Sequence, residues 1–228
     1  EPFGAVLRRG VASFKAAESA RLARIPIVFG SSREVYGDIH RHVTDESCAD
    51  FVVAESPYSA SKIAGEAFIY SYAQCYGLPY IVFRFSNVYG RYDNDLERME
   101  RVTPLFIRRI SQGEPIIIHG QEKILDFTYI DDCVDGICLG IEKLLSNEVR
   151  NQTINLACGE GNSLHQLALL IGRHTGMEPT ITFTPPQPGE VTRYIADISK
   201  ARKLLGYNPR TSLDVGIAKA IAWTRESG

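Results

Sequence analysis

A tyrosine and a lysine stand four residues apart, at Tyr58 and Lys62, in the run Tyr-Ser-Ala-Ser-Lys. On a helix this spacing places the phenol and the ammonium on one face. The pKa of a free phenol is about 10, and a neighbouring positive charge favours the phenolate and lowers that pKa. The pair therefore predicts a general base that works near neutral pH. The spacing is common by chance, so the surrounding sequence must distinguish such a base from an ordinary surface pair.

Two clusters of polar residues flank this helix in the sequence, and each directly follows an apolar, strand-like run. The first run, 25–29, leads into Ser31 and Ser32, and the second, 80–85, leads into Asn87. Parallel strands bring their carboxyl ends to one edge of a sheet, and ligands bind outside that edge. We therefore expect both clusters and the tyrosine–lysine pair to share one cleft. The clusters read Ser31-Ser32-Arg33-Glu34-Val35-Tyr36-Gly37 and Ser86-Asn87-Val88-Tyr89-Gly90.

Strand-like and helix-like segments alternate along most of the chain. Apolar strands separated by helices are typical of a parallel sheet that is covered on both faces. The pattern therefore predicts a doubly wound α/β fold. Strands are expected at 25–29, 80–85, 115–119, 127–130, 153–157 and 181–183, and helices at 5–24, 58–76, 103–112, 131–145, 163–175, 199–205 and 213–224.

The composition is that of a soluble globular protein, because 44% of the 228 residues are hydrophobic and 23% are charged. A formal net charge of -2 gives no electrostatic reason to expect nucleic acid or an acidic membrane surface as a partner. The longest apolar runs are far shorter than a membrane span. The five cysteines are scattered and do not complete metal-ligand spacing with the histidines. This indicates reduced thiols in a cytoplasmic protein and no metal site.

Three motifs together resemble the extended short-chain dehydrogenase/reductase family, which includes the NAD-dependent nucleotide-sugar epimerases and dehydratases. They are Ser-Ser-x-Glu-Val-Tyr-Gly at 31–37, Pro-Tyr-x-x-Ser-Lys at 57–62 and Arg-Phe-x-Asn-Val-Tyr-Gly at 84–90. Segments 126–132, 154–156, 196–201 and 205–209 continue the pattern. The resemblance therefore covers essentially the whole chain.

The resemblance implies a catalytic role for each residue that matches. Tyr58 would remove a proton from a sugar hydroxyl while hydride passes from the ring carbon to NAD. Lys62 would hold the hydroxyls of the nicotinamide ribose and keep the pKa of the phenol low. Ser32 would hydrogen-bond the reacting oxygen. Glu34 is expected to join them, because nucleotide-sugar decarboxylases keep an acid there.

The resemblance also implies binding residues around this centre. Asn87 resembles the residue that binds the substrate diphosphate, and the backbone near Phe85 and Ser86 would approach the nicotinamide amide. Arginines suit diphosphate or carboxylate recognition, although an ordinary surface arginine or a structural loop histidine is the alternative for these positions. Cofactor contacts are expected from Ser31, Tyr58, Lys62, Phe85 and Ser86, and substrate contacts from Asn87, Arg91, His119 and Arg193.

The glycine-rich turn that holds the cofactor phosphates in this family does not occur in the chain. We therefore expect an N-terminally truncated Rossmann-like domain, short by roughly 90 residues if three strand–helix units are absent. The remaining cofactor domain would cover 1–90 and 121–158. A smaller C-terminal substrate-binding lobe would cover 91–120 and 159–228. The chain by itself is then expected to be inactive.

The expected activity is NAD-dependent epimerisation of a nucleotide-diphosphate sugar, at carbon 4 of a UDP-hexose or UDP-uronate, through a keto sugar. Related dehydratases carry an acid where Arg33 follows Ser32, so dehydration is not expected. A UDP-glucuronate decarboxylase is the alternative enzyme, because Glu34 is present. Segment 187–191 resembles one in uronate epimerases and favours an acidic sugar only weakly.

A non-catalytic NAD(H)-binding regulatory protein on the same fold is the alternative of another class. The presence of Ser32, Tyr58 and Lys62 argues against it, since a binding module has no need of a base. The helices expected at 5–24 and 58–76 match the pair through which relatives dimerise. A homodimer is therefore expected, although both helices could equally just cover the sheet.

Overall fold

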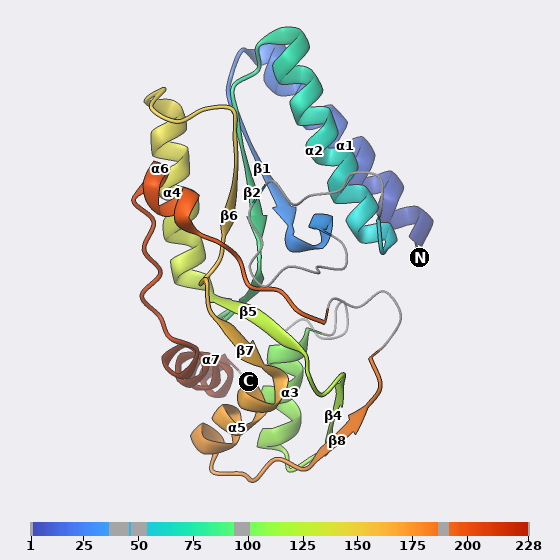
Figure 1. The fold of residues 1–228 in the computed structure, drawn as a ribbon, viewed down its shortest axis with the longest axis vertical. Helices are drawn as coiled ribbons and strands as arrows, with labels where there is room; N and C mark the ends of the chain where they lie inside the picture. Colours follow the sequence, from blue (N-terminus) through green and yellow to red (C-terminus); the bar gives the residue numbers. More distant parts are fainter. Residues whose placement is uncertain (1, 37–45, 47–53, 94–100, 187–191, 228) are drawn as a thin grey trace.

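The computed structural model describes residues 2–36, 46, 54–93, 101–186 and 192–227. A parallel sheet forms its upper part in Figure 1. Neighbouring strands are in register, with Ile27 opposite Tyr80 and Phe83 opposite Ile154. The middle strand is buried from Ile81 to Arg84, which agrees with cover on both faces. The strands, in the order β1-β2-β6, are β1 (Ile27–Ser32), β2 (Tyr80–Phe85) and β6 (Gln152–Leu156).

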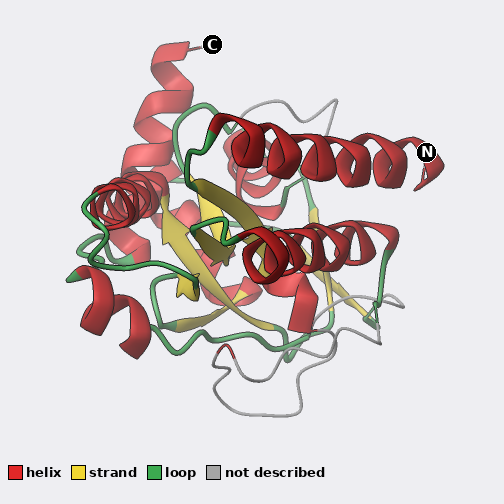
Figure 2. Cartoon of the chain, turned by 90° about the horizontal axis from the view of Figure 1, so that it is seen from above, coloured by secondary structure: helices red, strands yellow, loops and turns green. Residues whose placement is uncertain are grey.

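Helices cover both faces of this sheet, as Figures 1 and 2 show. α1 (Pro2–Ala23) and α2 (Pro57–Tyr76) lie side by side on one face, and α2 packs directly on β1. α4 (Ile130–Leu145) and α6 (Ser199–Leu205) lie on the other face, where both contribute to an apolar core with Phe83. The prediction of a doubly wound α/β fold is confirmed.

The lower part in Figure 1 is a second set of layers around the largest apolar cluster of the described residues. Its strands are β3 (Asn87–Tyr89), β4 (Ile116–His119), β5 (Ile124–Tyr129), β7 (Gly161–Ser163) and β8 (Ile181–Thr184). β5 pairs with β3 in parallel and with β7 antiparallel, while β4 pairs with β8 in parallel. The helices are α3 (Val102–Ser111), α5 (Leu164–Thr175) and α7 (Leu213–Ser227).

Most expected elements occur where the sequence placed them, but the sequence did not predict β3 and β7. Both are three-residue strands, and their polar residues gave no apolar period to detect. β5, whose start was expected at residue 127, begins at Ile124, where its backbone pairs with β7. The division into a cofactor domain and a substrate lobe stays a prediction. In the described part of the chain, no helix is both long and apolar enough to cross a membrane.

Helix α2 carries both Tyr58 and Lys62, and its start is fixed by a reciprocal cap. The Ser56 side chain accepts the Ser59 backbone N–H at 3.1 Å, and the Ser59 hydroxyl accepts the Ser56 backbone N–H at 3.0 Å. Such a capping box satisfies backbone donors that the first turn would otherwise leave unpaired. The helix ends at Gly77, whose φ of 69° is a left-handed conformation that glycine adopts readily.

A buried ion pair joins α2 to the sheet behind the tyrosine and lysine. The Arg84 guanidinium on β2 donates to both carboxylate oxygens of Glu66 on α2, at 3.0 and 2.7 Å. The two side chains are 2% and 0% exposed. The Tyr70 hydroxyl donates to the same carboxylate at 2.7 Å. The pair holds α2 in place along β2. Removal of either partner would leave the other as an uncompensated buried charge, which is strongly destabilising.

The contact between α4 and β2 is close enough to require a glycine. A Cβ added at Gly140 would lie 2.3 Å from the ring of Phe83, which is fully buried and has no room to move. We expect Gly140→Ala to lower the free energy of unfolding by about 1–3 kcal/mol, because overpacking a core forces neighbours out of place. The measurement is the urea midpoint at constant slope.

Gly10→Ala is the matched control for this prediction, since Gly10 also lies in a helix but a Cβ there meets no atom within 4 Å. Alanine is the better helix former by about 1 kcal/mol. The control is therefore expected to be neutral or stabilising. Equal behaviour of the two variants would contradict the close contact at Gly140.

Candidate active site

A cleft of about 1320 Å³ opens where β1 and β2 end. Its walls come from β1, α2, β2 and β3 on one side and from α3, β4 and β5 on the other. The structure thus brings together most of the residues that the sequence proposed, at the edge of the sheet that topology favours. Those that line the cleft are Ser31, Ser32, Glu34, Tyr58, Lys62, Phe85, Ser86, Asn87 and His119.

Tyr58 and Ser32 meet at the end of β1. Tyr58 lies in the first turn of α2 and is half-buried, while Ser32 is 9% exposed. The serine hydroxyl lies close enough to the phenol to favour the phenolate. The Ser32 hydroxyl also accepts the backbone N–H of Glu34 at 3.2 Å, in the short 3-10 helix η1 (Arg33–Tyr36). The serine oxygen is therefore held in one orientation beside the phenol.

The pKa of Tyr58 is raised above its ordinary value in this structure, mainly because burial penalises the phenolate. The Ser32 hydroxyl and the positive charges of Arg9 and Arg33 act in the opposite direction. Lys62 is not among the main causes of this shift, and its expected role in keeping the pKa of the phenol low stays a prediction. The lysine ammonium is directed elsewhere, and the Arg9 guanidinium lies 4.7 Å from the centre of the tyrosine ring.

Lys62 is directed toward β1 rather than toward the phenol oxygen. Its Nζ donates to the backbone carbonyl of Gly30 at 2.7 Å and lies 5.7 Å from the centre of the Tyr58 ring. Burial, with a further contribution from Arg9, lowers the pKa of the Lys62 ammonium. An ammonium has three donors, so Lys62 can still bind a ligand in the cleft while it keeps the bond to Gly30.

Glu34 connects the end of β1 to the start of α2. The Ser56 hydroxyl, which caps α2, donates to the Glu34 carboxylate at 3.3 Å. Glu34 follows Ser32 by two residues and lines the same cleft. Its carboxylate thus helps to position the first turn of α2, and its expected part in catalysis stays a prediction.

Asn87 is held in a chain of hydrogen bonds at the floor of the cleft. Its amide nitrogen donates to the backbone carbonyl of Asp126 at 2.9 Å, and its amide oxygen accepts from Arg33 at 3.2 Å. The neighbouring Ser86 hydroxyl shares a hydrogen bond of 2.6 Å with Thr128. These bonds fasten the end of β2 to β5, so two walls of the cleft move as one.

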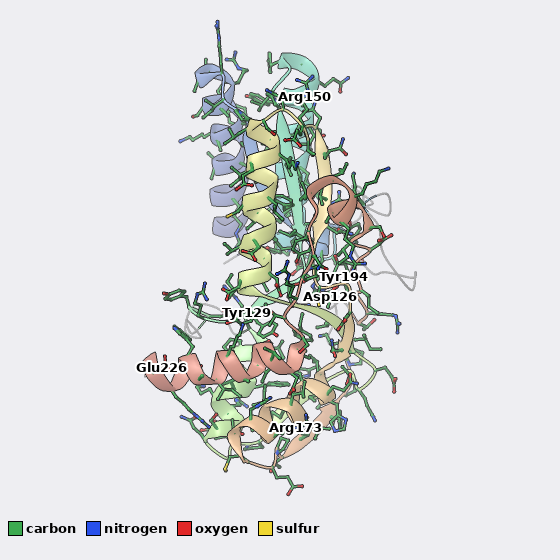
Figure 3. The ribbon with its side chains drawn as sticks, turned by 90° about the vertical axis from the view of Figure 1, so that its left-hand side faces the viewer. Asp126, Tyr129, Arg150, Arg173, Tyr194 and Glu226 are labelled. Carbon is green, nitrogen blue, oxygen red and sulfur yellow. The ribbon has the colours of Figure 1, made fainter. Side chains whose placement is uncertain are left out.

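Asp126 is a buried carboxylate that joins three segments beneath the cleft. It accepts backbone N–H groups from Cys158, Gly159 and Ala196, at 3.0, 2.9 and 3.3 Å. Burial raises its pKa to about 6 although these donors favour the charged form. Figure 3 shows Asp126 close to Tyr194, at the level where the main sheet meets the lower part. The sequence placed Asp126 in a motif without recognising this structural role.

Two predicted substrate residues are not among those that line the cleft. Arg91 forms an ion pair of 2.6 Å with Asp131, and the two side chains are 43% and 37% exposed. Arg193 bridges to Ile124 at the start of β5. His119 does line the cleft, where a ring nitrogen shares a hydrogen bond of 2.7 Å with Thr184. Substrate binding by these residues stays a prediction, and segment 187–191 lies outside the described residues.

The cleft carries more positive than negative charge. Among its described lining residues, six basic side chains face three acidic ones. Such a balance attracts a polyanionic ligand. The sequence gave no reason to place Arg9 or Arg109 here, because their helices carry no motif. The basic residues are Arg9, Arg33, Lys62, Arg101, Arg109 and Lys123, and the acidic ones are Glu34, Glu55 and Asp93.

The model of the NAD dependent epimerase/dehydratase family matches residues 7–157, which include Ser32, Tyr58, Lys62 and Asn87. The chain belongs to this family. The resemblance inferred from the three motifs is thereby confirmed. The matched region contains the main residues of the cleft described above.

Named relatives within the epimerase/dehydratase family agree with this assignment. The chain is 34% identical over 197 residues to a protein of Bacillus subtilis named an uncharacterized UDP-glucose epimerase. That match covers 86% of this chain and 59% of the relative, so the chain spans less than two thirds of the relative's length.

Two solved structures share the fold of this chain. A UDP-glucose 4-epimerase of Thermotoga maritima, solved with UDP-glucose, has a TM-score of 0.91 at 28% identity, over 100% of this chain and 72% of that one. A UDP-glucuronic acid 4-epimerase of Bacillus cereus, in complex with UDP-glucuronic acid and NAD, has a TM-score of 0.87 at 26% identity, over 96% and 68%.

Proposed function

We propose that this protein catalyses the NAD-dependent 4-epimerisation of a nucleotide-diphosphate sugar. The observation that carries the proposal is that the side chains of Ser32, Tyr58 and Lys62 line one cleft. The names of the similar proteins support it, since they are UDP-sugar epimerases. The same names do not favour a decarboxylase.

The two hydroxyls define where the sugar must react. A sugar hydroxyl placed against both would donate its proton to the Tyr58 oxygen and accept a hydrogen bond from Ser32. General bases of this kind typically accelerate a reaction by about 10²–10⁴-fold. Because burial raises the pKa of Tyr58, the phenolate needs positive charge nearby, and Arg9 and Arg33 supply it. The same phenol can return the proton to the sugar oxygen after the keto sugar has rotated in the cleft.

The residues around this point fit the nicotinamide end of NAD. Lys62 has donors to spare for ribose hydroxyls, and the buried Ser31 hydroxyl has no hydrogen-bond partner in the described structure. Phe85 and Ser86 line the same wall. When bound there, NAD would supply the acceptor and later the donor of the hydride. Lys62 and Ser31 would orient it against the sugar.

The basic excess of the cleft supports a diphosphate as the remote part of the substrate. Arg101, Arg109 and Lys123 stand on α3 and before β5, on the wall opposite Tyr58. Arginines bind phosphate oxygens with paired N–H groups. Arg101 is already paired with Asp93 at 2.6 Å, so Arg109 is the stronger candidate of the two arginines.

A homodimer is part of the proposal, formed through α1 and α2. An aromatic cluster lies on these helices, in which the Phe14 ring packs edge-on against Phe68 and Tyr72 at 5.8 and 6.2 Å. Phe14 is nevertheless 44% exposed. An apolar surface of this kind suits a protein partner. A cytoplasmic location stays a prediction, which the free thiols of the four described cysteines support.

The test of the function uses the protein at its natural length. It is mixed separately with UDP-glucose and UDP-glucuronate, and the products are separated and identified by NMR. We expect the 4-epimer to form without carbon dioxide release and without net reduction of NAD. Carbon dioxide would instead indicate the decarboxylase. Tight NAD binding without conversion of any nucleotide sugar would indicate the regulatory protein.

A further inference from the structure

Arg33 occupies an unusual place beside the reacting hydroxyls. It follows Ser32 directly, and its side chain lines the cleft. One terminal nitrogen, Nη2, donates to the amide oxygen of Asn87 at 3.2 Å. The other, Nη1, is buried and has no hydrogen-bond partner in the described structure. The guanidinium carbon lies 5.7 Å from the centre of the Tyr194 ring, whose buried hydroxyl also lacks a partner.

The positive charge of Arg33 is not neutralised by a direct ion pair among the described residues. Glu34 and Asp126 are the nearest acids that act on it, but Glu34 is bound by Ser56 and Asp126 accepts three backbone N–H groups. Burial lowers the pKa of the Arg33 guanidinium, which shows the same lack of compensation. A buried charge costs several kcal/mol unless it is paired.

A ligand carboxylate would remove this cost. The guanidinium binds a carboxylate through two N–H groups in parallel, and Nη1 is available for such a bond. A neutral sugar hydroxyl could accept one hydrogen bond but would leave the charge unpaired. The arrangement therefore favours an anionic group over an alcohol at this point of the cleft.

The position of Arg33 indicates which anion this is. Arg33 follows Ser32 directly and lines the same cleft as Ser32 and Tyr58, so it lies beside the reacting centre. The diphosphate has other cations, Arg109 and Lys123, on the opposite wall. A carboxylate this close to the reacting carbon must belong to the sugar itself.

We propose that Arg33 forms a subsite for a sugar carboxylate, so that the substrate is a nucleotide-diphosphate uronic acid rather than a neutral hexose. This inference rests on the proposed function and names its substrate class. Arg33 is a specificity-determining residue in this view. It discriminates between two sugars that share the same nucleotide and the same reacting hydroxyl.

The test compares kcat/KM for UDP-glucuronate and UDP-glucose in the natural-length protein and in Arg33→Met and Arg33→Lys. We expect the unchanged protein to prefer the uronate by about 100-fold or more, as polar recognition in a buried site can. Arg33→Met should lose most of that preference, because it should slow the uronate far more than UDP-glucose, which loses only the effect of the Arg33 charge on Tyr58. Arg33→Lys should retain part of it, because the charge remains.

Arg109→Met is the matched control, since Arg109 is another cleft arginine that would contact the shared diphosphate. It should slow both substrates alike and leave their ratio unchanged. An equal loss on both sugars in Arg33→Met would overturn the subsite, because it would mean a structural or diphosphate role. A preference for UDP-glucose in the unchanged protein would overturn it too.

Binding separates this inference from the proposed function. If neither sugar is converted, the epimerase proposal fails. The subsite is then tested separately by calorimetry, which compares the affinities of the two UDP-sugars for the unchanged protein and for Arg33→Met. Tighter binding of UDP-glucuronate that depends on Arg33 would support it. Equal binding of both sugars would overturn it.

Discussion

Replacing Tyr58 by phenylalanine is expected to lower kcat for the nucleotide sugar by about 10²–10⁴-fold, the contribution of a well-placed general base. The substitution removes only the hydroxyl, which faces the same cleft as Ser32. The ring remains to pack beneath Arg9. Substrate binding should therefore change little, and the loss should appear in kcat rather than in KM. Steady-state kinetics with product detection measure both.

Tyr76→Phe is the matched control for this variant. Tyr76 ends the same helix, but it is 60% exposed and does not line the cleft. Its loss of a hydroxyl should leave kcat within about twofold of the unchanged value, as surface changes away from a site usually do. If Tyr58→Phe keeps a kcat close to that of the unchanged protein, the proposed mechanism is contradicted, irrespective of the result for Tyr76→Phe.

Glu66→Gln is expected to lower the free energy of unfolding by about 3–5 kcal/mol, because it leaves Arg84 with an uncompensated buried charge. Both bonds from Arg84 to the carboxylate would be lost or weakened at once. A loss of this size is a large share of the stability of a typical domain. Urea unfolding followed by circular dichroism gives the value.

Two comparisons separate burial from simple loss of charge. Glu18→Gln breaks the pair with Arg21 on α1, whose side chains are 33% and 34% exposed, and should change the stability far less, because exposed ion pairs contribute little. Replacing both buried partners, Glu66→Leu with Arg84→Met, should recover most of the lost stability, because no lone charge remains. A similar effect of Glu66→Gln and Glu18→Gln would contradict the importance of burial.

The sequence was sufficient for the architecture because the strands are long, apolar and regularly separated by helices. It was also sufficient for the meeting of Ser32, Tyr58 and Lys62, because strand ends and helix starts share one edge of a parallel sheet. Short elements escaped prediction. β3 and β7 are strands only because β5 lies between them, and no local pattern encodes that partner.

Side-chain orientation was the harder part. The spacing of Tyr58 and Lys62 indicated a common face but not that the ammonium would bind the Gly30 carbonyl. Arg91 was expected to bind substrate as an arginine just beyond the third motif, yet it pairs with Asp131. Conversely, Arg33 was noticed only as a missing acid, and its buried Nη1 and its hydrogen bond to Asn87 on β3 become visible only in the folded chain. Such contacts depend on tertiary packing, which one-dimensional patterns do not contain.

The parallel register of β1, β2 and β6 has a consequence for how the chain reaches this state. Each strand pairs with a partner that lies beyond an intervening crossover, so no two of them can form a local hairpin. The chain must close these long loops before the strands can pair, and this makes folding slow. Intermediates with exposed apolar surface, which are prone to aggregate, therefore persist for longer. The cleft, which needs all of these crossovers closed, should be among the last features to mature when the chain refolds from denaturant.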